Sequence, residues 1–269
     1  MHLHALAPSL LISLLALLPL AAHAADAPAP AAGTPAVKAD MPEILLKFDD
    51  VVKVSPKWTR TAEFIKAEGL KVNFGIINSP LEQEDKELIK WVKDWEATGV
   101  VQFWCHGYDA KFVHDKDHKG EFEGTGYDAQ FKALQRSQEL AKLRFGHEYN
   151  AFGPHWSGTD ADTFKALDQI PGIKVVWGYG PKPPATTTKL IIERKLELEE
   201  RVGHPNAEMF KKNFEARGRK LPYISLQGHV EQWDDKGWAD VQTVVHYLKD
   251  QGCRFITVDE WLAEHEKKQ

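Results

Sequence analysis

The sequence predicts one large α/β domain with a mainly parallel sheet, and three observations support this fold class. Apolar runs of strand length alternate with helical patterns about seven times, which is typical of parallel strands joined by crossover helices. The segment from residue 43 to residue 269 has the length of a single large domain. No internal repeat divides it.

Residues 1–24 have the features of a secretory signal peptide. They contain no Asp, Glu, Lys or Arg, and an apolar block at residues 10–22 leads into small residues. The block is short for a membrane span, so we expect cleavage and export to the periplasm or beyond, rather than an uncleaved anchor. Residues 25–42 are rich in Ala and Pro, which is typical of a flexible tether.

Seven apolar segments of the remaining chain are predicted as strands. They are residues 44–48, 72–77, 100–105, 149–152, 173–177, 223–226 and 255–258.

Three segments between these strands are predicted as helices. Residues 126–146 and 238–252 place apolar side chains on one helical face and end in a glycine that can close the helix. Residues 159–167 begin with a capping-box pattern that runs from Thr159 to Asp162. Residues 181–220 form a longer connection between two predicted strands, which we expect to contain a loop and a solvated helix that cover one end of the fold.

Charge and cysteine content exclude some classes of function. The chain has 34 Lys and Arg residues against 39 Asp and Glu residues, which disfavours a nucleic-acid partner.

Cys105 ends one predicted strand and Cys253 begins another, so in a parallel barrel they would lie near opposite rims. We therefore expect two buried thiols, although export would permit a disulfide.

Ionisable residues gather at the C-terminal ends of the predicted strands, where parallel α/β folds carry their chemistry. The first strand ends in Asp49 and Asp50, the third in His106 and a later one in His229. Adjacent carboxylates repel each other, and burying either without a partner is costly. Each residue alone fits a turn, a cap or a core histidine. Together they predict a divalent metal site, most often zinc, with one Asp left as a base and His229 as an acid.

Four segments resemble the polysaccharide deacetylases, the NodB-homology or carbohydrate esterase family 4 group. They are FDD, HGYD, FGP with TDADTFKAL, and LQGHVEQW, in that order along residues 43–269. The resemblance implies a distorted (β/α)7 barrel that removes acyl groups, usually N-acetyl, from carbohydrates with a divalent metal. It implies that Asp49 is the base, that Asp50 and His106 are metal ligands and that His229 is the acid.

Two positions depart from the family pattern. Where the family has a second metal histidine, four residues after the first, this chain has Ala110. Zinc sites ordinarily use at least three protein ligands, so another residue is needed in place of this histidine. The first candidate is His114, the second is His155 from another strand end, and Asp109 is a further neighbour. The arginine that braces the base in the family's RxP motif is replaced by Phe152.

Aromatic residues near the strand ends are candidate sugar contacts, because a ring face packs on the apolar face of a pyranose. Tyr108, Trp156 and Trp233 are the predicted substrate-binding residues. The leading hypothesis is an exported, metal-dependent carbohydrate deacetylase. One alternative is a carbohydrate-binding relative that lost catalysis, which Ala110 favours. A Mg²⁺-dependent phosphoryl-transfer enzyme is disfavoured, because no Gly-rich phosphate loop is present.

Overall fold

The computed structural model describes residues 38, 40–109, 120–178 and 183–266. The predicted signal peptide and tether residues 25–37 and 39 lie outside these residues and stay predictions. One compact unit contains the whole described part of the chain. Within it, no helix is both long and apolar enough to cross a membrane.

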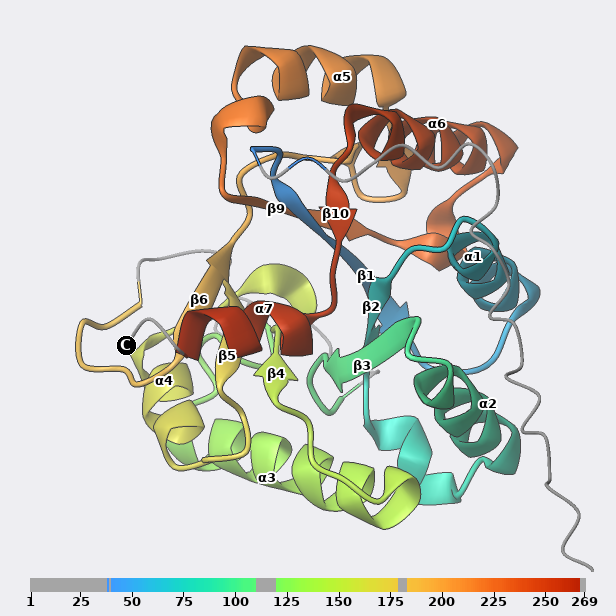
Figure 1. Cartoon of the computed structure of the whole chain (residues 1–269). Coiled ribbons are helices and arrows are strands. Elements are labelled where there is room, and N and C mark those ends of the chain that lie inside the picture. The colour runs from blue at the N-terminus through green and yellow to red at the C-terminus, as the bar shows by residue number, and fades with distance from the viewer. Residues whose placement is uncertain (1–37, 39, 110–119, 179–182, 267–269) are drawn as a thin grey trace, which may run out of the picture. The chain divides into compact units, whose positions relative to one another are not determined.

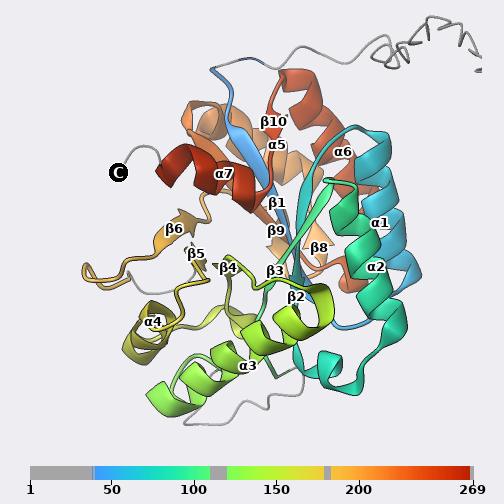
Figure 2. The same cartoon turned by 60° about the horizontal axis from the view of Figure 1, so that its bottom comes forward.

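Seven parallel strands form a sheet that is nearly closed into a barrel and surrounded by helices (Figure 1, Figure 2). In barrel order they are β9 (Tyr223–Gly228), β1 (Glu43–Val51), β2 (Val72–Ile76), β3 (Val101–Cys105), β4 (Ala151–Phe152), β5 (Val175–Gly178) and β6 (Leu190–Glu193). The short strand β10 (Arg254–Phe255) pairs only with the beginning of β1. The predicted distorted (β/α)7 barrel is confirmed.

Seven α-helices are described, and they lie outside the barrel. They are α1 (Pro56–Ala67), α2 (Lys86–Ala97), α3 (Tyr127–Phe145), α4 (Ala161–Asp168), α5 (Ala207–Ala216), α6 (Asp235–Gln251) and α7 (Val258–His265). Gly146 and Gly252 end α3 and α6 in the left-handed conformation, as predicted. The capping box of α4 is one residue later than predicted, between Asp160 and Thr163.

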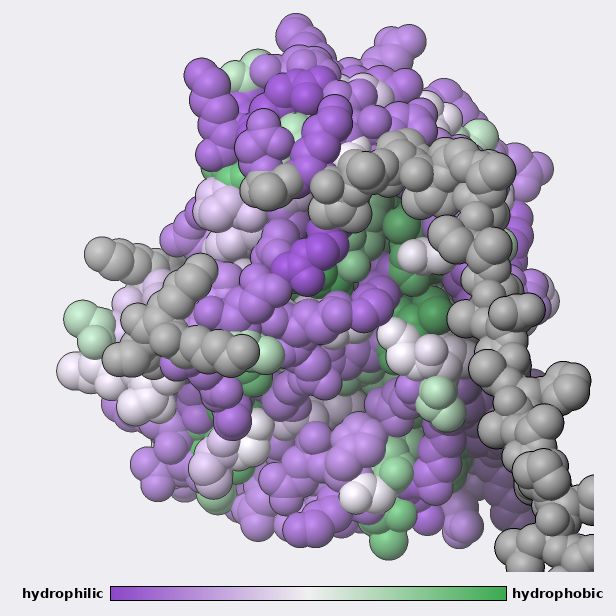
Figure 3. Space-filling model, in the orientation of Figure 1, coloured by the Kyte–Doolittle hydropathy of each residue, from purple (hydrophilic) through white to green (hydrophobic). Residues whose placement is uncertain are grey.

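The alternation of side chains along β1 separates the two sides of the barrel wall. Leu45 belongs to an inner apolar cluster with Trp104, whereas its neighbours on either side join the outer core beneath the helices. Because side chains alternate along a strand, Lys47 and Asp49 share the inner side with Leu45. Helix α7 contributes Trp261 to the inner cluster. Figure 3 shows a mainly hydrophilic face with smaller apolar groups, in keeping with most of the large apolar side chains packing in these two layers.

Residues 183–220 correct the expectation of a loop and a solvated helix. They contain β6, which continues the barrel, then the hairpin of β7 (Glu199–Arg201) and β8 (His204–Pro205), then α5. The predicted strand at 255–258 is also shorter, because Val258 already begins α7. Cys105 and Cys253 are buried free thiols, as expected.

Candidate active site

A bulge at the end of β1 turns two consecutive carboxylates into one pocket. The register between β1 and β2 shifts between Phe48 and Val51, and Asp50 has a φ of 76°. In a regular strand Asp49 and Asp50 would point to opposite faces, but here both line the same pocket. Left-handed backbone at a non-glycine residue costs about 1–3 kcal/mol and is concentrated at functional sites.

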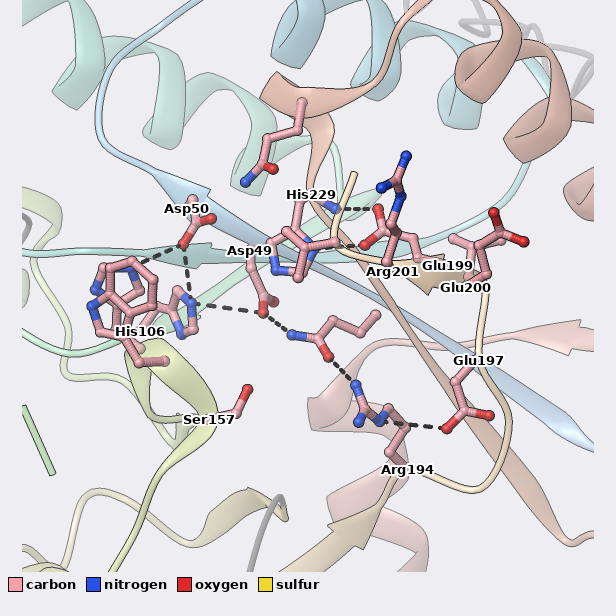
Figure 4. A pocket seen from close by; sticks show the side chains of 16 residues that line it. Asp49, Asp50, His106, Ser157, Arg194, Glu197, Glu199, Glu200, Arg201 and His229 are labelled. Atoms are coloured by element: carbon pink, nitrogen blue, oxygen red, sulfur yellow. Dashed lines mark hydrogen bonds and ion pairs between the residues drawn. The ribbon is translucent and has the colours of Figure 1, made fainter. Parts of the chain in front are cut away.

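The pocket has a volume of about 440 Å³ and lies at the C-terminal ends of the barrel strands (Figure 4). Its lining comes from the ends of β1, β3 and β9, from the 3-10 turns η2 (His155–Ser157) and η4 (Val230–Gln232), and from residues 194–202. It brings together the predicted residues Asp49, Asp50, His106, Trp156 and His229.

Asp49 is held by a buried lysine that the sequence pattern did not single out. Lys47 Nζ donates hydrogen bonds to both carboxylate oxygens, at 2.6 and 2.7 Å, and neither side chain is more than 1% exposed. Burial lowers the pKa of Lys47, and the charge of Asp49 opposes this shift. Gln227 Nε2 donates to Asp49 Oδ2 at 2.7 Å, and Arg194 donates to Gln227 Oε1 at 2.6 Å.

The cation beside Asp49 therefore comes from its own strand. Phe152, which replaces the family's bracing arginine, packs in the outer core with its ring centre 4.8 Å from that of Phe122. The ammonium of Lys47 lies inside the barrel, 4.6 Å from the centre of the Trp104 ring.

Asp50 faces two imidazoles. Its Oδ1 lies 3.3 Å from His106 Nε2 and 3.6 Å from His155 Nε2, and it is buried without a hydrogen-bond partner in the described part of the chain. His106 Nδ1 lies 2.9 Å from the Gly153 carbonyl oxygen, so in the neutral ring Nδ1 carries the proton and Nε2 faces the pocket as an acceptor.

Burial and neighbouring charges shift the pKa values of this group. Burial alone would raise the pKa of Asp50, but the imidazoles of His106, His155 and His229 hold it below its usual range. Burial, together with the neighbouring His106, lowers the pKa of His155 to about 4. At neutral pH Asp50 is therefore ionised and His155 is neutral.

The donor set of Asp50, His106 and His155 fits a zinc-type ion in chemistry and in two distances. Ligand atoms about 2.0–2.1 Å from a tetrahedral ion lie about 3.3–3.4 Å from one another. The two distances from Asp50 Oδ1 are close to this value. No three His, Cys, Asp or Glu side chains among the described residues are already arranged as a complete metal site. Binding would therefore have to draw these three donors together. Ala110 and His114 lie outside the described residues.

His229 is fixed by a carboxylate from the β7–β8 hairpin. Its Nδ1 lies 2.7 Å from Glu199 Oε2, and its backbone N–H donates to Glu199 Oε1 at 2.9 Å. Trp233 Nε1 donates to the same Oε1 at 2.6 Å. Burial lowers the pKa of His229, but Glu199, Asp49 and Asp50 outweigh it, so the pKa is raised. The sequence did not predict this contact, because the strand that carries Glu199 has only three residues and is too short to show a hydrophobic period.

The three predicted sugar-contacting aromatics lie in different surroundings. Trp156 lines the pocket, is 52% exposed and stacks on His155 with ring centres 4.8 Å apart. Trp233 is 1% exposed, so the prediction is corrected: its ring cannot face a sugar, and it holds Glu199 instead. Tyr108 does not line the pocket, and its hydroxyl donates to Glu82 at 3.1 Å.

Comparison with solved structures finds this barrel among carbohydrate esterase family 4 (CE4) proteins. The Xyl-CE4 domain of a multidomain xylanase from the hindgut metagenome of Trinervitermes trinervoides is 14% identical, with 84% of this chain and 92% of that chain covered and a TM-score of 0.57. A family 4 acetyl xylan esterase from Clostridium thermocellum, in complex with a cobalt ion, is 14% identical, with 81% and 89% covered and a TM-score of 0.57. The chain has the CE4 fold.

A CE4 family pseudoenzyme from Bacillus anthracis has the same fold. It is 14% identical, with a TM-score of 0.56 over 82% of this chain, and this chain spans 65% of its length. No protein-family model matches the sequence, and the comparison with curated proteins finds no match. At this identity the likeness establishes the fold, so the chemistry has to be argued from the side chains of the pocket.

Proposed function

We propose that this chain is an exported, metal-dependent hydrolase that removes N-acetyl or related acyl groups from a carbohydrate. The observation that carries the proposal is the meeting of three groups in one pocket. They are the braced carboxylate Asp49, the donors around Asp50, and His229 with its Glu199 partner. The CE4 fold supports the reaction class, since a solved acetyl xylan esterase and a peptidoglycan N-acetylglucosamine deacetylase share this barrel.

The residues divide the work of acyl hydrolysis among them. A metal held by Asp50, His106 and His155 would polarise the acyl carbonyl group and lower the pKa of a water molecule. Asp49 takes the proton of the attacking water, and Lys47 and Gln227 fix the orientation of its carboxylate. His229 donates a proton from Nε2 to the leaving nitrogen or oxygen. Glu199 stabilises the protonated ring through Nδ1.

Release of acetate from N-acetylated chitooligosaccharides by the purified protein tests this proposal. We expect activity that a chelator abolishes and that added zinc restores. Asp49→Asn should lower turnover by about 10²–10⁴-fold, the usual contribution of a general base, with metal content retained. An unchanged turnover in Asp49→Asn would contradict the assignment of the base.

A carbohydrate-binding protein without catalysis is the second candidate. It is favoured by the absence of a complete three-ligand metal site among the described residues and by the pseudoenzyme that shares the fold. This candidate would bind oligosaccharides, release no acetate and hold no stoichiometric metal.

Export of the chain is part of the proposal and rests on residues 1–24. Expression of the full chain in a bacterial host followed by cell fractionation tests it. Mature protein that begins near residue 25, in the periplasm or the medium, is the expected result. A full-length product in the cytoplasm would contradict it.

A further inference from the structure

We propose that the pocket takes an acidic carbohydrate, in which Arg201 binds a carboxylate of the sugar next to the acylated residue. The inference rests on the proposed function and extends it by naming the class of substrate. It comes from the charges and exposed side chains of the β7–β8 hairpin.

The carboxylates of the pocket lining, apart from Asp50, already have protein partners. Lys47 and Gln227 donate to Asp49, His229 and Trp233 pair with Glu199, Asn206 donates to Glu200, and Arg194 and Arg217 lie 3.9 and 3.8 Å from Glu197. Every acidic side chain that lines the pocket, except the proposed metal ligand Asp50, therefore already has a protein partner.

The two arginines of the pocket lining differ in whether their side chains have protein partners. Arg194 donates to Gln227 at 2.6 Å and lies near Glu197. The side chain of Arg201 is exposed, and it has no hydrogen bond or ion pair to any residue that the structure describes. Figure 4 shows Arg201 on the hairpin segment that also carries Glu199 and Glu200. This cation lies two residues after Glu199 in β7 and lines the same pocket as the proposed acid, His229.

Exposed apolar side chains mark the same pocket. Only Leu143, Trp156 and Val202 are large, apolar and exposed among the described residues, and two of them, Trp156 and Val202, line the pocket. Val202 follows Arg201 directly in the hairpin. Apolar surface suits the face of a pyranose ring.

A guanidinium suits a carboxylate at the edge of that ring, because it can donate two parallel hydrogen bonds. A neutral sugar would leave Arg201 unmatched. The combination of Trp156, Val202 and Arg201 therefore favours an acylated amino sugar that is linked to a sugar acid.

Calorimetric binding of two tetrasaccharides to the full chain tests the inference. The Asp49→Asn form is used, so that turnover does not interfere. The acidic probe is a hyaluronan tetrasaccharide, in which N-acetylglucosamine alternates with glucuronate. The neutral probe is tetra-N-acetylchitotetraose, called chitotetraose below. We expect the acidic probe to bind roughly 10–100-fold more tightly, the usual size of a charged hydrogen-bonded contact.

Arg201→Gln should reduce the affinity for the acidic probe to that for chitotetraose and leave chitotetraose binding unchanged. Lys236→Gln is the matched control, because it removes one exposed cation that does not line the pocket. It should change neither affinity.

Equal binding of the two probes, or a preference that survives Arg201→Gln, would overturn the inference. The same holds if neither probe binds. Acetate release from chitooligosaccharides by the parent protein separates the two proposals. If it is present while the acidic preference is absent, the proposed function stands and only the role of Arg201 fails.

Discussion

Lys47→Met tests whether a buried ion pair holds Asp49 in place. Methionine keeps most of the length of the lysine side chain but lacks the charge, so contacts inside the barrel are largely preserved. The carboxylate of Asp49, 1% exposed, would keep only the Gln227 amide as a described side-chain donor within hydrogen-bond distance. It must then stay buried as an unpaired charge or take up a proton.

The expected cost follows from the geometry of the pair. Lys47 Nζ lies 2.6 and 2.7 Å from the two Asp49 oxygens, and the exposed fractions of the two side chains are 0% and 1%. Removing one partner of such a buried pair costs about 3–5 kcal/mol of unfolding free energy. An exposed pair is a matched control: Lys90 and Asp94 are 76% and 60% exposed, so Lys90→Met should cost about 0–1 kcal/mol.

Urea unfolding at pH 7 measures both changes, and a double-mutant cycle isolates the pair. Lys47→Met combined with Asp49→Asn should be much less destabilised than the sum of the single variants, because neither partner is then left as a buried unpaired charge. We expect a coupling energy of about 2–3 kcal/mol. A loss below about 1 kcal/mol in Lys47→Met, with no coupling to Asp49, would refute the reasoning.

Three further predictions concern catalysis and binding. Glu199→Gln should move the alkaline limb of the pH–rate profile to lower pH, because Glu199 raises the pKa of His229 and His229 must be protonated to act as the acid. Glu199→Asp should keep the limb at a higher pH than Glu199→Gln does, and an unmoved limb in Glu199→Gln would exclude this role. Trp156→Ala should raise KM by about 2–10-fold with little change in kcat, the size of an aromatic stacking contact, and an unchanged KM would remove it from the sugar site. Ala110→His should leave zinc affinity within about threefold of the parent if His155 already serves as the third ligand, whereas a large gain would show that the position is vacant.

The parallel strands and the strand-end residues could be predicted because each is a local signal, whereas the distorted barrel is implied by the family resemblance. An apolar run that stops at Asp49 and Asp50, or at His106, marks a C-terminal strand end without knowledge of the rest of the fold. Six of the seven predicted strands form barrel strands for the same reason. The bulge that directs Asp49 and Asp50 into one pocket depends on the pairing of β1 with β2, so no local pattern announces it.

The missed residues act through contacts that the sequence pattern does not identify. Lys47 resembles an interruption of an apolar strand; alternation places it on the same side as Asp49, but only the closed barrel shows that this side is the inner one. Glu199 lies 30 residues from His229 in a short charged strand, whose signal is too weak to separate it from a solvated helix. Trp233 resembles a sugar platform in sequence, but its indole N–H is used inside the protein.

Zinc titration of the purified protein, followed with a competing chelator dye, tests the metal site most directly. We expect about one zinc per chain, with affinity lowered by about 100-fold or more in Asp50→Ala and in His155→Ala. His229→Ala removes an imidazole from the same pocket and should leave zinc affinity nearly unchanged. Parent-like affinity in His155→Ala, or no zinc bound by the parent protein, would contradict a metal held by Asp50, His106 and His155.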